Sequence, residues 1–585
     1  MFRLPSGWQE ISSAEFLRRI AGFSRALDGL GVKTGDRVGV FAPNCPEWHV
    51  ADFAVTGLGA VVVPIYFRES IERMCYILKD SGVKAVFVAG ADQAHAVALL
   101  RPNLPDLQHI IVARNALHAD PHSAGAIDLP EGEALEYEAL VAGAGASEVE
   151  SYRGRAAQLR PEQLATLIYT SGTTGEPKGV MLSHRNLSSN ATNAITPDFR
   201  PADIGLSFLP LSHVYERQLA YMYFFTGMTV AYVERMEDVQ QALLEVRPHL
   251  VAAVPRFFEK IFAGLIQRGR KLTGLKRLLF DWGMLVAAEA APWKSSGRPA
   301  SLGLRLKWAV ADRLIYSKIR AAMGGRIRSF IAGGGPLSKE LAEFFWGVDI
   351  RVYQGYGLTE TSPIVCTNTP AQNRMGTSGK LIPNVEVRIA EDGEIEVRGP
   401  CVMMGYYNKP EATREALCPD GWLRTGDIGV LDKDGYLTIT DRKKDLIKTA
   451  GGKFVAPQPI ENLLKSCPYI LNAVVVGDRR KFVSALIVPN FAAVETAARE
   501  AGVKFTSPSE LLTHPWTREL IEHEVTRLTL GLAQYEKIKR FALLDRDFTF
   551  DDGQLTYTLK LRRRVIEERH KDVIEQLYAD AGHIS

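Results

Sequence analysis

Cysteine is scarce and scattered in this sequence of 585 residues. The six cysteines form no CxxC pair, so we expect neither a zinc site nor a disulfide-stapled fold, and a reducing compartment is predicted. An excess of one charge is also lacking, since 70 basic and 67 acidic residues give a formal net charge of +3. This balance, without a nucleic-acid-binding motif, predicts no nucleic-acid partner.

Long apolar runs are missing as well. The N-terminus reaches charge and polarity too soon for a signal peptide. The most apolar stretch, 53–67, contains Gly57, Gly59 and Pro64 and is shorter than the roughly 20 residues of a spanning helix. It predicts a buried helix followed by a buried strand, and a cytoplasmic location for the chain.

The sequence does contain a regular alternation of expected strands and helices. Helices at 46–58 and 70–81 separate the first three strands, and the spacing predicts parallel sheets with right-handed crossovers. The expected strands are 37–42, 61–65, 85–89, 109–113, 165–170, 228–234, 250–255, 327–332 and 349–353.

The pattern changes after Gly357. Asp-Gly pairs at 392–393 and 434–435, each between alternating apolar residues, predict two hairpins. The charged run 441–445 is a candidate linker, which divides the chain into a body, 1–440, and a C-terminal part, 446–585. Strands at 473–477 and 484–488 and helices at 512–530 and 561–578 predict that this part is a small α+β unit.

One stretch, 169–179 (YTSGTTGEPKG), follows a predicted strand and resembles no P-loop, because glycine does not directly precede its lysine. Glycines let backbone amides approach a polyanion, hydroxyls donate hydrogen bonds, and the lysine adds a mobile positive charge. It therefore predicts a phosphate cradle. The binding residues expected there are Thr170, Ser171, Gly172, Thr173, Thr174, Gly175 and Lys178.

Four further motifs extend this pattern: 354–361 (QGYGLTET), 421–427 (GWLRTGD), 441–448 (DRKKDLIK) and 555–560 (LTYTLK). In this order the five motifs resemble those of the adenylate-forming superfamily, which includes acyl-CoA synthetases. The resemblance covers nearly the whole chain. It implies an α/β fold with a large multi-sheet N-terminal body of the acyl-CoA synthetase type and a small mobile α+β C-terminal domain.

The chemistry that the resemblance implies joins a carboxylate to the α-phosphate of ATP, so that AMP becomes the leaving group. Such a site must hold triphosphate, metal and carboxylate together while charge builds on phosphorus. Glu360 suits Mg²⁺ as a hard oxygen ligand. The other implied roles are Thr359 at the α-phosphate, Gly334, Gly335, Tyr356 and Gly357 at adenine, and Asp427 and Arg442 at ribose.

The resemblance also implies roles for residues of the hinge and of the mobile C-terminal domain, and for one histidine. Lys560 is the expected catalytic lysine of the first half-reaction, and Lys444 is the expected pivot. Lys448 is expected to serve the second half-reaction. For His213 two interpretations stay open: a position near the carboxylate of the substrate, or a core histidine whose hydrogen bonds are satisfied within the fold.

Two stretches, 209–217 (LPLSHVYER) and 254–260 (VPRFFEK), resemble long-chain fatty-acid:CoA ligases, as does the insertion before Arg328. They predict an acid–thiol ligase that uses a fatty acid, ATP and coenzyme A. One alternative is a fatty acyl-AMP ligase that delivers the acyl group to a carrier protein. A second is a catalytically silent nucleotide- or lipid-binding regulator, against which the retention of Glu360 and Lys560 argues.

The segment 268–328 contains 14 basic and 3 acidic residues, interleaved with tryptophan and leucine. This composition is typical of a helix at an anionic membrane surface, such as the inner face of a membrane, and also of a solvated helical face. Both interpretations stay open. The chain length of the acid is not predicted, and the oligomeric state stays open, with a homodimer as one candidate.

Overall fold

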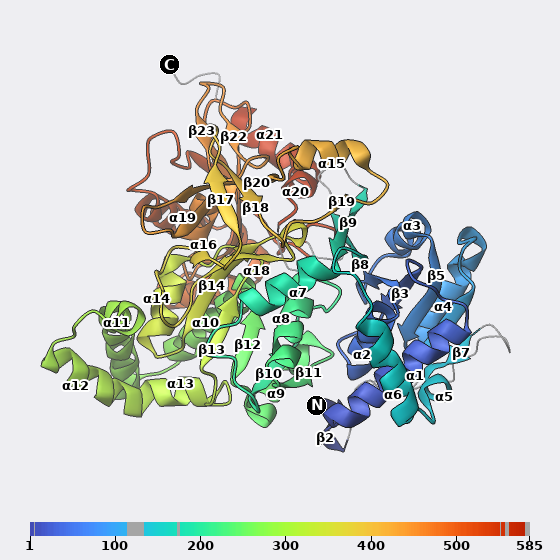
Figure 1. Ribbon diagram of the computed structural model, residues 1–585. Helices are drawn as coiled ribbons and strands as arrows, with labels where there is room; N and C mark the ends of the chain where they lie inside the picture. Colours follow the sequence, from blue (N-terminus) through green and yellow to red (C-terminus); the bar gives the residue numbers. More distant parts are fainter. Residues whose placement is uncertain (5, 114–133, 172–175, 550–551, 556–560, 580–585) are drawn as a thin grey trace.

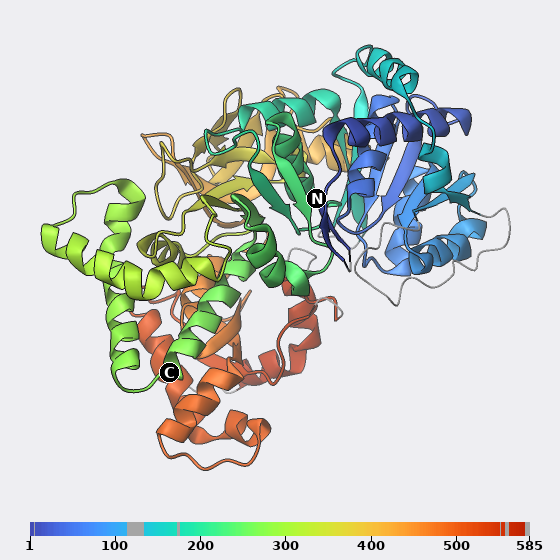
Figure 2. The same cartoon turned by 90° about the horizontal axis from the view of Figure 1, so that it is seen from below.

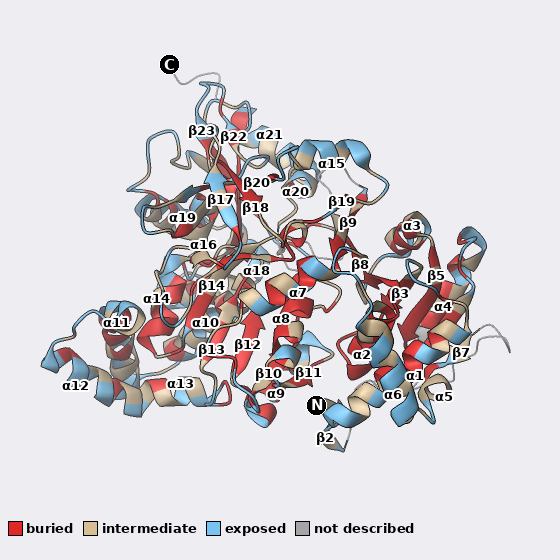
Figure 3. Cartoon of the chain, viewed as in Figure 1, coloured by how far each residue is buried: buried red, intermediate tan, exposed pale blue. Residues whose placement is uncertain are grey.

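The computed structural model describes residues 1–4, 6–113, 134–171, 176–549, 552–555 and 561–579. In this part of the chain two large sheets form the body, and a four-stranded sheet and a C-terminal α+β unit lie above them in the view of Figure 1. Central strands and the helices between the large sheets are buried (Figure 3).

The first large sheet confirms the strands expected at 37–42, 61–65, 85–89 and 109–113. These four pair in parallel, and β8 and β9 close one side as an antiparallel hairpin. The strands, in spatial order, are β19 (Gly405–Tyr406), β9 (Pro177–Ser183), β8 (Leu164–Ser171), β4 (Val61–Ile65), β3 (Arg37–Phe41), β5 (Val83–Ala89), β6 (His109–Ala113) and β7 (Leu135–Glu136). Helices α1 (Ser13–Gly29), α2 (Pro46–Gly57), α3 (Ile71–Ser81), α4 (Ala91–Leu100), α5 (Tyr137–Val141) and α6 (Ala146–Ala156) accompany it.

The second large sheet contains the later parallel strands. Its order is β11 (Thr229–Tyr232), β10 (Ile204–Ser207), β12 (Leu250–Ala253), β13 (Ser329–Ala332), β14 (Val352–Gly357), β15 (Ile364–Thr367) and β16 (Lys380–Leu381). The prediction that the last parallel strand begins at Asp349 was wrong: Asp349 has φ 60°, which extended backbone does not allow, so β14 begins at Val352.

Helices of the body follow these strands and the insertion. They are α7 (His184–Asn193), α8 (Val214–Phe225), α9 (Val239–Val246), α10 (Pro255–Arg270), α11 (Gly274–Ser296), α12 (Leu302–Ala311), α13 (Ser317–Ala321) and α14 (Lys339–Gly347). A buried ion pair between Arg217 of α8 and Asp52 of α2 joins the two large sheets, and the same guanidinium donates to Thr166 on β8. The α8 helix is thereby held against both sheets.

The two predicted hairpins form one four-stranded sheet. Its strands are β17 (Glu386–Ile389), β18 (Glu394–Arg398), β20 (Leu423–Leu431) and β21 (Leu437–Arg442), and α15 (Pro410–Ala416) lies between β18 and β20 in the chain. Because β21 ends at Arg442, the first two residues of the charged run 441–445 belong to a strand.

The C-terminal part is an α+β unit. It contains β22 (Ile447–Lys448), β23 (Phe454–Val455), β24 (Ile470–Val476), β25 (Ser484–Pro489), β26 (Arg540–Leu543), α16 (Pro457–Lys465), α17 (Phe491–Glu500), α18 (Pro508–Thr513), α19 (Pro515–Leu528), α20 (Arg563–Arg569) and α21 (Lys571–Ala579). The prediction of one helix over 561–578 was wrong. His570 leaves the helical region and its ring contacts Gln554, so two helices form.

Candidate active site

A cleft of about 1650 Å³ lies where the body, the four-stranded sheet and the C-terminal part meet. The carboxyl ends of β13 and β14 and the β8–β9 hairpin form its walls. Carboxyl ends of parallel strands are the usual place for ligands in α/β sheets. The predicted site residues that line it are Thr170, Lys178, His213, Gly334, Gly335, Tyr356, Gly357, Thr359, Glu360, Asp427, Arg442 and Lys444.

Three side chains are connected to one another on the side of the cleft where the nucleoside is expected. Asp427 and Arg442 face each other across the antiparallel pair β20–β21. The hydroxyl of Tyr356 donates to Asp427 Oδ2 at 2.7 Å, and Arg442 Nε lies 3.0 Å from Asp427 Oδ1. The Asp427 carboxylate raises the pKa of Arg442, and burial raises the pKa of Tyr356, so the group holds one buried carboxylate, one guanidinium and a neutral phenol.

Two glycines that line the cleft have steric roles. A Cβ on Gly357 would lie 1.6 Å from the carbonyl oxygen of Pro363, so no side chain fits there. Gly334 has φ 77°, a left-handed conformation that favours glycine. Glycine is therefore required at 357 by the close approach of Pro363 and favoured at 334 by the backbone conformation, and both residues line the cleft.

The expected phosphate and metal side centres on Glu360. It lies in the short 3-10 helix Thr359–Thr361 that follows β14. The hydroxyl of Tyr406 donates to Glu360 Oε1 at 2.8 Å, and the ammonium of Lys178 lies 5.0 Å from the centre of the Tyr406 ring. Tyr406 therefore connects the predicted metal ligand to the predicted phosphate lysine.

The sequence analysis missed Tyr406. It lies on β19, which pairs with β9 of the phosphate hairpin, Tyr406 opposite Val180. Strand pairing between segments more than two hundred residues apart leaves no local signal in the sequence. Burial and the adjacent Glu360 carboxylate raise the pKa of Tyr406, so its hydroxyl stays protonated as a donor.

The carboxylate of Glu360 fits a Mg²⁺ ion whose other ligands come from the substrate and from water. Among the described residues no group of three or more His, Cys, Asp or Glu side chains could hold a metal. Mg²⁺ is commonly bound by one or two carboxylates together with substrate phosphates and water. The single carboxylate of Glu360 fits that mode, in which the nucleotide supplies further ligands.

His213 caps the N-terminus of α8 and lines the cleft. Its Nδ1 accepts a hydrogen bond from the Tyr215 backbone N–H at 3.2 Å. Since Nδ1 is the acceptor, a neutral His213 has its proton on Nε2. His213 is thus a half-buried helix cap at the cleft and not a core histidine, and a position near the carboxylate stays a prediction.

One predicted residue, Lys448, is not brought to this group, and six others are not placed by the described part of the chain. Lys448, on β22, is exposed and is absent from the cleft lining; its ammonium lies 5.5 Å from the Phe454 ring centre. The side chain of Ser171, together with Gly172, Thr173, Thr174, Gly175 and Lys560, lies outside the described residues. Leu555 and Leu561, on either side of 556–560, do line the cleft.

A second region of the cleft lies on one face of the second large sheet. Ser329 and Ile331 are two residues apart on β13, so their side chains lie on the same face of the sheet. Tyr353 pairs with Ile331 on the neighbouring strand β14 and shares that face. Helix α8 covers it with Leu219 and Met222. The far end is polar, because the Ser329 hydroxyl donates to buried Asp198.

Known proteins are similar to this chain over nearly its full length. Residues 2–407 match the family "AMP-binding enzyme" and residues 444–582 match "AMP-binding enzyme C-terminal domain". Long-chain-fatty-acid–CoA ligase FadD15 of Mycobacterium bovis is 38% identical over 588 residues, covering 98% of this chain and 94% of that protein. Human long-chain-fatty-acid–CoA ligase ACSBG1 is 31% identical over 621 residues, covering 99% and 83%.

Solved structures agree on the fold. The adenylation domain of a carboxylate reductase from Mycobacterium chelonae superposes with a TM-score of 0.76 at 24% identity, covering 97% of this chain and 84% of that one. ATP-bound MatB from Rhodopseudomonas palustris gives 0.69 at 22% identity, covering 98% and 96%. These likenesses confirm the predicted α/β body with a separate C-terminal domain.

Proposed function

Because the chain belongs to the AMP-binding enzyme family, we propose that it activates a long-chain fatty acid as acyl-AMP and transfers the acyl group to coenzyme A. The observation that carries this proposal is the similarity to FadD15 over 98% of the chain. The connected groups Tyr356–Asp427–Arg442 and Lys178–Tyr406–Glu360, which face one cleft, support it.

In the first half-reaction the fatty-acid carboxylate attacks the α-phosphorus of ATP, and pyrophosphate leaves. Asp427 accepts from the ribose hydroxyls, and its contacts with Tyr356 and Arg442 hold it in place. Lys178 and Thr359 stabilise the charge that grows on the phosphoryl oxygens. Glu360 would hold Mg²⁺, which neutralises phosphate charge when bound. Lys560 adds a positive charge from the C-terminal part.

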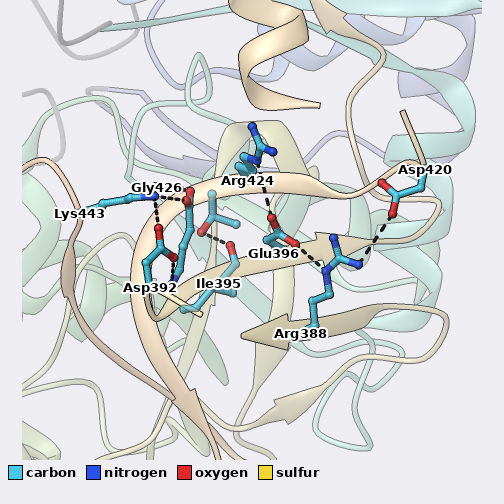
Figure 4. A network of polar contacts seen from close by, with 10 residues as sticks. Arg388, Asp392, Ile395, Glu396, Asp420, Arg424, Gly426 and Lys443 are labelled. Atoms are coloured by element: carbon cyan, nitrogen blue, oxygen red, sulfur yellow. Dashed lines mark hydrogen bonds and ion pairs between the residues drawn. The ribbon is translucent and has the colours of Figure 1, made fainter. Parts of the chain in front are cut away.

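In the second half-reaction the thiol of coenzyme A attacks the acyl carbon, and AMP leaves. We assign the change of C-terminal orientation to the pivot at Lys444. Its neighbour Lys443 is held to the four-stranded sheet, because the ammonium lies 2.6 Å from Asp392 Oδ2 (Figure 4) and 2.7 Å from Glu394 Oε2. Rotation after this anchor would withdraw Lys560 and bring Lys448 to the cleft.

The face lined by Ser329, Ile331 and Tyr353 is our proposed acyl site. The four residues of β13 span about 13 Å at roughly 3.3 Å per residue, which accommodates about ten carbons of an extended chain at roughly 1.3 Å per bond. Longer chains must bend beyond the polar end at Asp198 and Ser329.

We also propose that an anionic membrane surface is a partner. Among the described residues, no helix is both long and apolar enough to cross a membrane. In α11 and α12, however, large apolar side chains face solvent: Leu275 is 72%, Leu285 73%, Leu302 84% and Leu306 70% exposed. Exposed leucines within a strongly basic segment fit docking on the cytoplasmic face of a membrane, close to the supply of fatty acid.

The test is fatty-acid-dependent ATP–pyrophosphate exchange, followed by acyl-CoA formation after addition of coenzyme A. Exchange and thioester formation with long-chain acids are expected. Exchange without thioester would favour the acyl-AMP ligase that serves a carrier protein. No exchange with any carboxylate would favour the silent regulator and would overturn the proposal.

A further inference from the structure

Helix α10 connects the body to the C-terminal part through charged side chains. Arg256 Nη2 lies 2.9 Å from Asp547 Oδ2, and Arg256 Nη1 donates to the Leu471 carbonyl at 3.3 Å. Glu259 Oε1 lies 3.5 Å from Lys465 Nζ. We call these four side chains, Arg256, Glu259, Lys465 and Asp547, the interdomain clasp.

The clasp is anchored firmly on the body. Arg256 and Glu259 are three residues apart and contact each other at 3.3 Å, so they share one face of α10. The opposite face inserts Phe258, which is fully buried and packs edge-on against Phe330 and Phe345. Helix α10 therefore cannot follow the C-terminal part without leaving the core.

The C-terminal side of the clasp is equally well held. Asp547 Oδ1 accepts from the Asn472 amide and from the Phe548 backbone N–H, both at 2.9 Å, which leaves Oδ2 for Arg256. Near the end of α10, the Arg270 guanidinium lies 5.0 Å from the Tyr469 ring centre and extends the same contact surface. Figure 2 shows the C-terminal elements beside α10 from below.

The orientation that the clasp holds is the one expected for adenylation. Leu555 and Leu561, which flank the segment of Lys560, line the cleft, whereas Lys448 does not. The clasp also begins next to the nucleotide site: Val254 and Pro255 at the start of α10 contact the positions of Gly334 and Gly335. Any rotation that exchanges Lys560 for Lys448 moves Asp547 and Lys465 away from α10.

We infer that Arg256 and Glu259 are positioning residues, which act by stabilising the C-terminal orientation of the first half-reaction. This inference rests on the proposed function and adds to it a means of setting the balance between the two orientations. The clasp side chains are 20–30% exposed, so their contacts are weak enough to break in each turnover and sensitive to salt.

The test compares the two half-reactions in the full-length protein. Arg256→Ala should lower fatty-acid-dependent pyrophosphate release about tenfold, since one to two kcal/mol lost from one conformer shifts a two-state balance roughly 5- to 30-fold. Conversion of supplied acyl-AMP and coenzyme A to thioester should be unchanged or faster. Arg256→Lys should recover part of the loss, because the positive charge is retained.

The matched control is Lys260→Ala, which removes the same charge from an exposed position of α10. It should leave both half-reactions unchanged. Arg256→Ala combined with Asp547→Ala should be no slower in pyrophosphate release than Arg256→Ala alone, because Arg256→Ala already removes the contact with Asp547. Raised salt should slow the wild type more than Arg256→Ala.

Two outcomes would overturn the inference. Equal slowing of both half-reactions in Arg256→Ala would show that Arg256 supports the fold alone, and unchanged rates of both half-reactions would show that the clasp does not set the orientation. Both require an active wild type, so they differ from failure of the proposed function, in which the wild type itself forms no acyl-AMP.

Discussion

The hydrogen bond from Tyr406 to Glu360 allows a sharp test of the metal site. Tyr406→Phe removes the hydroxyl that donates to Glu360 Oε1 at 2.8 Å and keeps the ring beside Lys178. A hydrogen bond to a charged group is worth about 1.5–3 kcal/mol. Loss of a group that orients a metal ligand commonly costs about 10–100-fold in metal affinity.

The expected result is therefore a shift of the Mg²⁺ concentration for half-maximal pyrophosphate exchange by about 10–100-fold upward. The maximal rate at saturating Mg²⁺ should fall much less, because Lys178 keeps its position. The assay is pyrophosphate exchange across a Mg²⁺ titration at fixed ATP.

Tyr407→Phe is the matched control, since it removes a neighbouring hydroxyl and should leave the Mg²⁺ titration unchanged. An unchanged or lower Mg²⁺ requirement in Tyr406→Phe would refute the assignment of Glu360 as the ligand that Tyr406 orients. A lower maximal rate with the same Mg²⁺ dependence would refute it equally.

The phosphate loop, the C-terminal lysine, the acyl site and the basic segment each give one further prediction. Lys178→Ala should reduce pyrophosphate exchange by about 10²–10³ without loss of folded protein by circular dichroism; unchanged kinetics would contradict its phosphate role. Lys560→Ala should lose most pyrophosphate release yet still convert supplied acyl-AMP to thioester, and equal slowing of both steps would count against domain rotation. Met222→Trp, which narrows the acyl site, should lower kcat/KM about tenfold for long-chain acids but not for six-carbon acids, and a uniform loss would remove Met222 from that site. The wild type should sediment with phosphatidylserine vesicles at low salt but not with phosphatidylcholine vesicles, and Leu306→Glu should weaken it; binding that ignores lipid charge would contradict the membrane proposal.

Local sequence determined much of the body. The alternation of apolar strands with helices predicted the parallel strands at 37–42, 61–65 and 85–89, which the structure confirms. Asp-Gly pairs marked both hairpins of the four-stranded sheet. These features depend on side-chain periodicity and turn chemistry, which neighbouring residues carry.

Irregular backbone was harder to predict. The start of β14 and the break between α20 and α21 depend on single residues, Asp349 with a positive φ and His570 with a tertiary contact. Periodicity averages over many residues, so one residue with a special conformation does not change the pattern enough to be seen.

Of the site residues that the sequence analysis named and whose side chains are described, all but Lys448 line the cleft, but the motifs did not show how these residues are connected. Tyr356 and Asp427 are 71 positions apart, and Tyr406 meets Glu360 across 46 positions. The contact between Arg256 and Asp547 spans 291 positions. Residue types and order were therefore readable from the sequence. Which carboxylate accepts from which hydroxyl, and which helix holds the C-terminal part, depended on long-range packing, because such contacts leave no trace in the spacing of neighbours.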